Sequence, residues 1–185
     1  MSDSENINKR LGIKLKGFEY DKKFVFSEVG YNFEPSEMGA SFGLVQLQKF
    51  GGFSKLRNRN FKLHSNFFKK WNEFFIIPRI LKDVSTNFLA YPIILKKNNL
   101  FDRKQLQVFL ENNNVQTRPI FSGNILRHPA FESLISNRNK LNSFKNADYI
   151  MKYGILIGCH QGLSITNIKY IHSLIVSFIK KNEKN

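Results

Sequence analysis

The sequence predicts an α/β protein in which a small sheet is covered by helices and preceded by a pair of helices. In the second half, apolar segments of strand character alternate with segments of helical period, in the order strand, helix, strand, short helix, strand, helix. The 19 Phe residues among 185 demand a large buried core. No repeat or low-complexity linker interrupts the chain. We therefore expect one unit: a partly disordered N-terminal extension at 1–23, a connecting segment with the helical pair at 24–72, and a small α/β domain at 73–185.

The first half predicts an extended segment and two helices. Residues 23–33 have extended character, and Ser36 is a suitable N-cap for a helix with Met38, Phe42 and Val45 on its apolar face. The pair Gly51-Gly52 is expected to end this helix. Ser54 then begins a second helix, whose apolar stripe consists of Leu56, Leu63, Phe67 and Trp71.

The second half begins with strand-like segments at 74–78 and 88–95. Pro92 in the second of these marks an edge position or a bulge, because proline cannot donate to a ladder. Asp102 caps a helix that runs to about Glu111, and Asn residues at 112–114 end it, since Asn tolerates the left-handed conformation. Residues 115–120, VQTRPI, form the next strand.

The chain closes with a short helix at 146–154 and a strand at 155–160. Ser164 caps a final helix, and the apolar residues of this helix recur three and four apart, which is a strong helical signal. They are Ile168, Ile171, Ile175 and Phe178.

The net charge of +15, from 29 Lys and Arg against 14 Asp and Glu, raises nucleic acid, anionic membranes and phosphorylated ligands as partners. The basic residues are spread along the chain, however, and a general composition bias toward Lys, Asn, Ile and Phe explains them equally well. Residues 53–71 interleave Arg and Lys with Phe and Trp. On a helix the aromatics share the apolar stripe and the cations lie opposite, which favours a packed helix with a solvated face over a nucleic-acid site.

The single cysteine, Cys159, excludes an internal disulfide framework and a multi-cysteine metal site. No apolar run approaches the ~20 residues that a bilayer-spanning helix needs. The first ten residues also lack the apolar stretch of a signal peptide. We therefore expect a cytoplasmic protein with no membrane partner and no bound metal.

The spacing of reactive side chains predicts no self-contained catalytic site. Cys159 and His160 are adjacent on a strand and point to opposite faces, so they do not form a nucleophile–base pair. His64 and His172 fall within helices and are expected at the surface or half-buried. No glycine-rich phosphate loop follows a strand and opens a helix.

Residues 115–131, VQTRPIFSGNILRHPAF, stand out because directional polar side chains crowd among apolar ones. One reading is a surface loop over the edge of the core, in which Arg118 forms a salt bridge and Asn124 caps a turn. The other reading is a ligand-facing loop. Its candidate substrate-binding residues are Arg118, Phe121, Asn124, Arg127 and His128.

Four segments in order resemble the DegT/DnrJ/EryC1/StrS sugar aminotransferase family. They are FVFSEVGYNFEPSEMGASFGLVQL (24–47), LRNRNF (56–61), VQTRPIFSGNILRHPAF (115–131) and GILIGCHQGLSITNIKYIHSLIVSFI (154–179). The third segment is similar to the branch that contains nucleotide-sugar 3-dehydratases and the lipopolysaccharide-synthesis enzymes close to them. The resemblance extends from about residue 8 to residue 180.

The resemblance implies the C-terminal small domain of an aspartate-aminotransferase-like protein of pyridoxal phosphate (PLP) fold type I. The large domain, with the Lys or His of the cofactor site, would be missing from this chain, which would then be inactive alone. A split gene, a truncated reading frame and an incomplete record all remain open as explanations. The complete enzyme would be a homodimer that acts on a nucleotide-linked sugar in lipopolysaccharide or O-antigen synthesis, as a transaminase or a 3-dehydratase.

Site residues follow from the same resemblance. Asn32 of the GYN motif would contact the cofactor phosphate of the other subunit, as a neutral donor. The loop at 115–131 would line the sugar-nucleotide pocket, with Arg118 or Arg127 binding the diphosphate through a bidentate guanidinium. An exposed apolar surface is expected where the large domain packs, mainly on residues 36–50 and 54–71. The competing hypothesis is a small basic module that binds nucleic acid or another polyanion.

Overall fold

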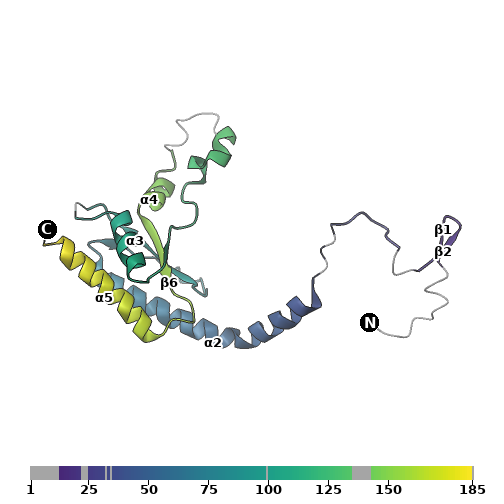
Figure 1. Cartoon of the computed structure of the whole chain (residues 1–185), viewed down its shortest axis with the longest axis horizontal. Coiled ribbons are helices and arrows are strands. Elements are labelled where there is room, and N and C mark those ends of the chain that lie inside the picture. Colours follow the sequence, from purple (N-terminus) through teal and green to yellow (C-terminus); the bar gives the residue numbers. More distant parts are fainter. Residues whose placement is uncertain are drawn as a thin grey trace. The chain divides into compact units, whose positions relative to one another are not determined.

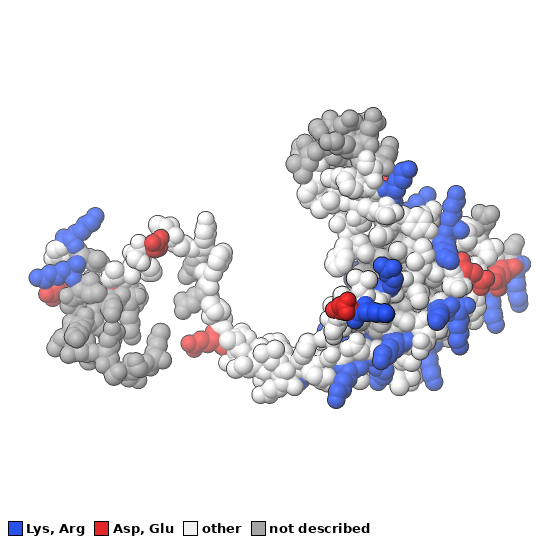
Figure 2. Space-filling view, turned by 180° about the vertical axis from the view of Figure 1, so that it is seen from behind, with Lys and Arg blue, Asp and Glu red and all other residues white. Residues whose placement is uncertain are grey.

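A computed structural model describes residues 13–21, 25–31, 33, 35–98, 100–134 and 143–184 (Figure 1). The chain divides into two compact units, Met1–Leu44 and Val45–Asn185. None of the helices in these described ranges combines the length and the apolar character needed to cross a membrane. Lys and Arg side chains are spread over the face of the larger unit that Figure 2 presents, with few Asp and Glu between them.

The smaller unit contains an antiparallel hairpin of β1 (Ile13–Leu15) and β2 (Phe18–Tyr20). The two turn residues, Lys16 and Gly17, both have positive φ, at 48° and 96°. Two consecutive positive φ values are typical of the tight turns whose twist matches that of a hairpin. This hairpin lies in the predicted extension, where no strand was expected. The described residues between 25 and 33 form no strand.

The predicted helical pair is wrong, because one helix, α2 (Glu37–Phe68), runs through both segments. Gly51 and Gly52 lie inside this helix and neither has positive φ. Glycine lowers helix stability but does not by itself end a helix. The Ser54 hydroxyl, expected to cap a second helix, instead donates to Asn87 Oδ1 at 2.5 Å. A 3₁₀ turn, η2 (Lys69–Trp71), follows α2 directly.

The second half of α2 supplies one wall of the core. Its buried residues are Asn60, Phe61, His64 and Phe68. The predicted stripe of Leu56, Leu63, Phe67 and Trp71 is only partly buried. The most buried line along the helix is therefore displaced from that stripe. Apolar spacing alone could not locate it, because two of its four members are polar.

These polar residues, with the arginines beside them, hold the turn that joins the last strand to the last helix. Asn60 Nδ2 donates to the carbonyl of His160 at 2.9 Å, and Arg59 Nη2 donates to the carbonyl of Leu163 at 3.0 Å. Arg57 Nε donates to Gln161 Oε1 at 2.8 Å. Backbone carbonyls at 160–163 are thus satisfied from a helix about a hundred residues earlier in the chain.

The sheet of the larger unit has four antiparallel strands in the order β3-β4-β6-β5. Their bounds are β3 (Phe75–Ile76), β4 (Ala90–Leu95), β5 (Thr117–Arg118) and β6 (Gly154–Gly158). Alternate residues of the two central strands are buried, as period-two strands require. These residues and buried residues of α2, α3 and α5 form one core cluster (Figure 1).

Pro92 lies in the central strand β4 and has no backbone N–H group. At its position no neighbouring strand would accept a hydrogen bond from that group. Pairing between β3 and β4 ends at Ile94. Lys96 N donates to the carbonyl of Phe74, toward β3. Because backbone groups alternate sides along a strand, the nitrogen of Pro92 faces the same side, beyond the last β3 partner. The predicted edge character is therefore local to one side of the strand.

The predicted helices of the second half are confirmed. Asp102 caps α3 (Arg103–Asn112) through a reciprocal capping box with Gln105, and Asn114 after its end has φ of 60°. A short helix, α4 (Lys145–Tyr153), precedes β6. Ser164 caps α5 (Ile165–Asn182) in the same way, with Asn167. The alternation of strand and helix read from the sequence is thus the observed element order.

Candidate functional site

The segment at 119–131 is a loop packed against α4. It leaves β5 at Arg118, which is paired with Leu156, so the chain then runs toward the β6 end that begins at Gly154. Gly123 has φ of 61°, and a Cβ there would lie 2.5 Å from the Met151 Cβ of α4. Only glycine fits this turn, so the loop is held closely to α4.

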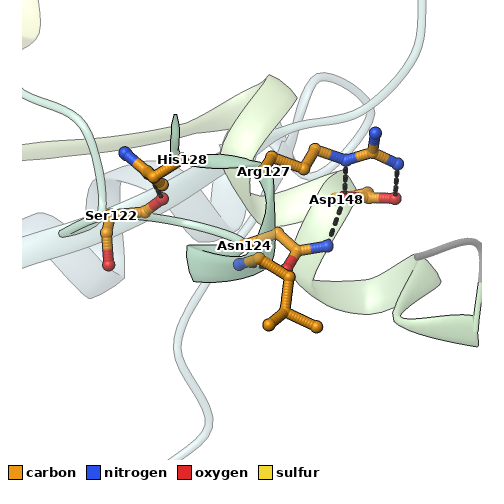
Figure 3. A network of polar contacts seen from close by, with 6 residues as sticks. Ser122, Asn124, Arg127, His128 and Asp148 are labelled. Atoms are coloured by element: carbon orange, nitrogen blue, oxygen red, sulfur yellow. Dashed lines mark hydrogen bonds and ion pairs between the residues drawn. The ribbon is translucent and has the colours of Figure 1, made fainter. Parts of the chain in front are cut away.

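One carboxylate fixes this loop from the first turn of α4. Arg127 donates through Nε and Nη2 to the two oxygens of Asp148, each at 2.5 Å (Figure 3). Asn124 Nδ2 donates to Asp148 Oδ1 at 2.7 Å, while Asn124 Oδ1 accepts from the backbone nitrogen of Leu126 at 3.2 Å. We refer to Asn124, Arg127 and Asp148 as the Asp148 clasp. Its loop residues are the N-cap and the last residue of the 3₁₀ turn η3 (Ile125–Arg127), which is followed by the 3₁₀ turn η4 (Pro129–Leu134).

The charges of Asp148 and Arg127 stabilise each other. The hydrogen bond from Arg127, followed by that from Asn124, lowers the pKa of Asp148 from 3.8 to about 2. The same pairing raises the pKa of Arg127. Asn124 is only 3% exposed, so its amide is used within the chain. Both Asn124 and Arg127 are thus bonded to Asp148, and this bonding competes with their predicted role in binding a substrate.

Within the loop, the side chain of His128 is hydrogen-bonded, whereas that of Phe121 is exposed. His128 Nε2 donates to the carbonyl of Ser122 at 2.8 Å, which closes the turn, since a carbonyl only accepts. Phe121 has φ of 46° and is 86% exposed. A bulky aromatic rarely adopts the left-handed region. Of the predicted loop residues, Phe121 is the one that faces solvent with its side chain unused.

Arg118 lies apart from the clasp. It lines a groove of about 480 Å³ together with Gln116, His160 and Tyr170. This groove lies toward the Gly158 end of β6, whereas the loop runs toward the Gly154 end. The structure thus brings Asn124, Arg127 and His128 together and leaves Arg118 outside their network.

A histidine pair, which the sequence did not predict, joins α2 to α5: His64 is buried, whereas His172 is half-buried, as expected for that residue. His64 Nε2 donates to the carbonyl of Gly158 at 3.1 Å, so its Nδ1 accepts from His172 Nε2, also at 3.1 Å. Burial lowers the pKa of His64 to about 4 and that of His172 to about 3. The expectation that His64 is at the surface or half-buried is wrong, because its two ring nitrogens are satisfied inside the core.

Two further predictions concern reactive groups. Cys159 is buried, and burial raises its pKa to about 12, which fits an inert apolar role and not a nucleophile. Asn32 lies outside the described residues. Among the residues that are described, no three His, Cys, Asp or Glu side chains gather as metal ligands. Asp148 was missed because nothing in the sequence links it to a loop 24 residues earlier.

The sequence matches the DegT/DnrJ/EryC1/StrS aminotransferase family over residues 1–176. The lipopolysaccharide biosynthesis protein RfbH of Salmonella typhimurium is 30% identical over 94% of this chain and 40% of that protein. The GDP-4-keto-6-deoxy-D-mannose 3-dehydratase of Escherichia coli O55:H7 is 27% identical over 91% of this chain and 42% of the relative. The chain thus spans about two fifths of the length of these relatives.

Solved structures give the same result. The E. coli GDP-4-keto-6-deoxy-D-mannose-3-dehydratase with bound hydrated PLP has a TM-score of 0.66 and 28% identity, over 82% of this chain and 38% of that one. The Helicobacter pylori aminotransferase PseC, at 20% identity, shares the fold with a TM-score of 0.72 over 94% of this chain and 44% of its own. These structures confirm the predicted fold class, a small α/β domain of a PLP fold type I protein. The chain belongs to the DegT/DnrJ/EryC1/StrS aminotransferase family.

Proposed function

We propose that this chain forms the C-terminal portion of a PLP-dependent nucleotide-sugar transaminase or 3-dehydratase that serves cell-surface polysaccharide synthesis. Family membership and the similarity to a lipopolysaccharide biosynthesis protein and to GDP-sugar 3-dehydratases support this function. A large domain, carrying the cofactor-bonding residue, would complete the enzyme, and the complete enzyme would be a homodimer.

The observation that carries the proposal is the surface of the first half of α2. Val45, Leu47 and Phe50 are 45%, 69% and 51% exposed. At about 100° per residue, Leu47 and Phe50 lie about 200° and 140° around the helix axis from Val45. A helix that is apolar on several sides is normally buried on several sides. This segment therefore has the surface of a helix inserted into a larger core.

The same apolar character extends back to the start of the helix. Met38, Phe42 and Leu44 are 84%, 68% and 63% exposed, as predicted for residues 36–50. The corresponding prediction for 54–71 is wrong, because Phe61 and Phe68 are buried in the core of this chain. The surface for the large domain is thus confined to the first half of the helix, and the second half belongs to the small domain.

PLP, when bound, supplies a ring that stores the negative charge of a deprotonated substrate. The described residues do not form a complete cradle for it, because the covalent Lys or its His replacement would come from the large domain. From this chain we propose a single cofactor contact, Asn32 of the GYN motif, which donates to the phosphate of the other subunit's PLP. This assignment rests on the motif.

On the substrate side, the chain would bind and orient the nucleotide sugar. Arg118 is the better diphosphate ligand, because Arg127 is already paired with both oxygens of Asp148. The loop at 119–131 would exclude water from one wall of the pocket. Asn124 and His128 would shape this wall, since their side chains bond within the chain.

The proposal is tested by complementation. The chain alone should bind no PLP, whereas the chain with a large domain from the family should form dimers that show the visible absorbance of bound PLP. A Phe42→Asp and Leu47→Asp double variant should lose association, because charge replaces apolar surface at the contact. Asn66→Asp, exposed on the second half of the same helix, is the matched control.

Absence of both PLP binding and dimers in the complemented sample would contradict the proposal. Steeply salt-dependent binding to random oligonucleotides by the unassociated chain would instead favour the polyanion-binding alternative.

A further inference from the structure

We propose that Asp148 is a positioning residue for the loop at 119–131, and that the loop contacts its ligand through Phe121. In this view Asn124 and Arg127 anchor the loop and do not touch the substrate. The inference rests on the proposed function, whose substrate-binding wall it redefines.

The first support is the set of hydrogen bonds that Asp148 accepts. Three donor atoms from two residues converge on one carboxylate, at 2.5, 2.5 and 2.7 Å. Charge-assisted bidentate pairs of this kind are stronger and more directional than neutral hydrogen bonds. Moving the Nε and Nη2 groups of Arg127, or the amide of Asn124, to a ligand would take donors away from the ionised Asp148. The geometry therefore favours a fixed anchor over a pair that exchanges with substrate.

The second support is the local backbone of Phe121. Its φ of 46° is costly for a bulky residue, and no apolar burial offsets the cost, since its side chain is 86% exposed. The chain is fixed on either side of it: before it, Arg118 is paired with Leu156 in the sheet, and after it two contacts hold the turn. Gly123 is close against Met151, and His128 holds the carbonyl of Ser122. A strained, exposed aromatic in a loop that is anchored on both sides is suited to contact a ligand.

The ligand chemistry follows from the ring. An exposed phenyl group offers a flat apolar face that stacks on another planar ring without reading its hydrogen-bonding edge. In a nucleotide sugar the planar group is the nucleobase. We assign Phe121 to the nucleobase, with the Asp148 clasp holding the ring at the required position.

The first experiment measures hydrogen exchange in the full chain. Asp148→Asn removes the ion pair, and the amides of Leu126 and His128 should exchange on the order of tenfold faster, with little change in the midpoint of global unfolding. Because Asp148 also lies in the first turn of α4, Arg127→Gln is a second variant that leaves this helix intact. Asp83→Asn, an exposed aspartate outside the clasp, is the control.

The second experiment uses the enzyme assembled with its large domain. Asp148→Asn should raise KM for the nucleotide sugar on the order of tenfold and leave kcat within about a factor of two, as expected when the lost interaction is equally strong in the ground state and the transition state. Phe121→Ala should have the same effect. Because Asp148 acts through Phe121, the double variant should be no worse than the poorer single variant.

The outcomes separate the two proposals. Unchanged loop exchange in both clasp variants would overturn the positioning role, and additive effects of Asp148→Asn and Phe121→Ala would overturn the action through Phe121. Failure to assemble a PLP enzyme would sink the proposed function, and with it the nucleobase assignment. The exchange experiment would still decide whether Asp148 positions the loop.

Discussion

The two halves of α2 differ in how they use their apolar residues. In the second half, Phe61 and Phe68 are 7% and 0% exposed and contact the sheet and α5 through the core cluster. In the first half, Phe42 and Leu47 are 68% and 69% exposed, although their spacing is equally helical. One continuous helix thus combines a segment that is packed in the core of this chain and a segment whose apolar side chains are exposed. The spacing of apolar residues predicts the helix but not which of its halves is covered.

The largest effect is expected at the covered half. Phe68→Ala removes a ring that packs on Phe75 and Tyr91, with centroids at 5.2 and 5.6 Å. Truncating a buried Phe lowers the free energy of unfolding by about 3–5 kcal/mol. Denaturant unfolding of the chain measures this loss. A loss below about 1 kcal/mol would mean that the second half is no more essential to the core than the first.

Between pH ~6.5 and 5, a pH dependence should come from His64 in the covered half and its partner His172 on α5. Below pH ~6.5 the unfolded chain takes up protons at His64 and His172, whereas the folded pKa values of about 4 and about 3 keep both rings neutral. The unfolded state therefore binds more protons, and the free energy of unfolding falls as the pH drops from ~6.5 toward 5. His172→Gln should reduce this slope by up to one proton. Equal slopes in the two proteins would refute the lowered pKa of His172 in the folded chain.

The boundary between the halves predicts a smaller gain. Gly51→Ala and Gly52→Ala should each raise the free energy of unfolding by about 0.5–1 kcal/mol, because a Cβ at either position meets no atom within 4 Å. In the complemented enzyme the same changes should weaken association if the large domain approaches the glycines closely. A gain in the isolated chain together with a loss in the assembly would locate the contact at this boundary.

The smallest effect is expected at the uncovered half. Leu47→Gln should change the free energy of unfolding of the isolated chain by less than about 0.5 kcal/mol, since the side chain is already in water. Thermal or denaturant unfolding tests this directly. A loss comparable to that of Phe68→Ala would show that the exposed half is in fact part of the folding core.

Much of the fold could be predicted from local signals. The caps at Asp102 and Ser164 and the left-handed Asn114 lie where sequence rules place them, because the chemistry that ends a helix involves neighbouring residues. The extent of α2 could not be predicted in this way. The helix of 32 residues continues through Gly51 and Gly52, so low helix propensity at two positions does not decide where it ends.

In the candidate site, too, local signals could be read from the sequence and distant partners could not. The segment at 115–131 was recognisable as unusual because its polar residues are close in sequence. The partner that defines their role is distant, since Asp148 lies 24 residues from Asn124. The histidine pair outside this segment is more distant still, since His172 lies 108 residues from His64. Residue types indicate which groups can bond, but the pairing that occupies them is fixed only by the fold.

The hydrogen bonds from α2 to the turn at 160–163 also affect how the chain folds during its synthesis. Asn60 finds its acceptor at His160, 100 residues later, and the partner of His64 comes later still. At synthesis rates of about 5–20 residues per second, the helix waits on the order of ten seconds with these polar groups unpaired. Contacts of such long range also slow refolding from the complete chain. We therefore expect premature association of the nascent chain to be most favourable during this interval, before α5 is synthesised and can dock.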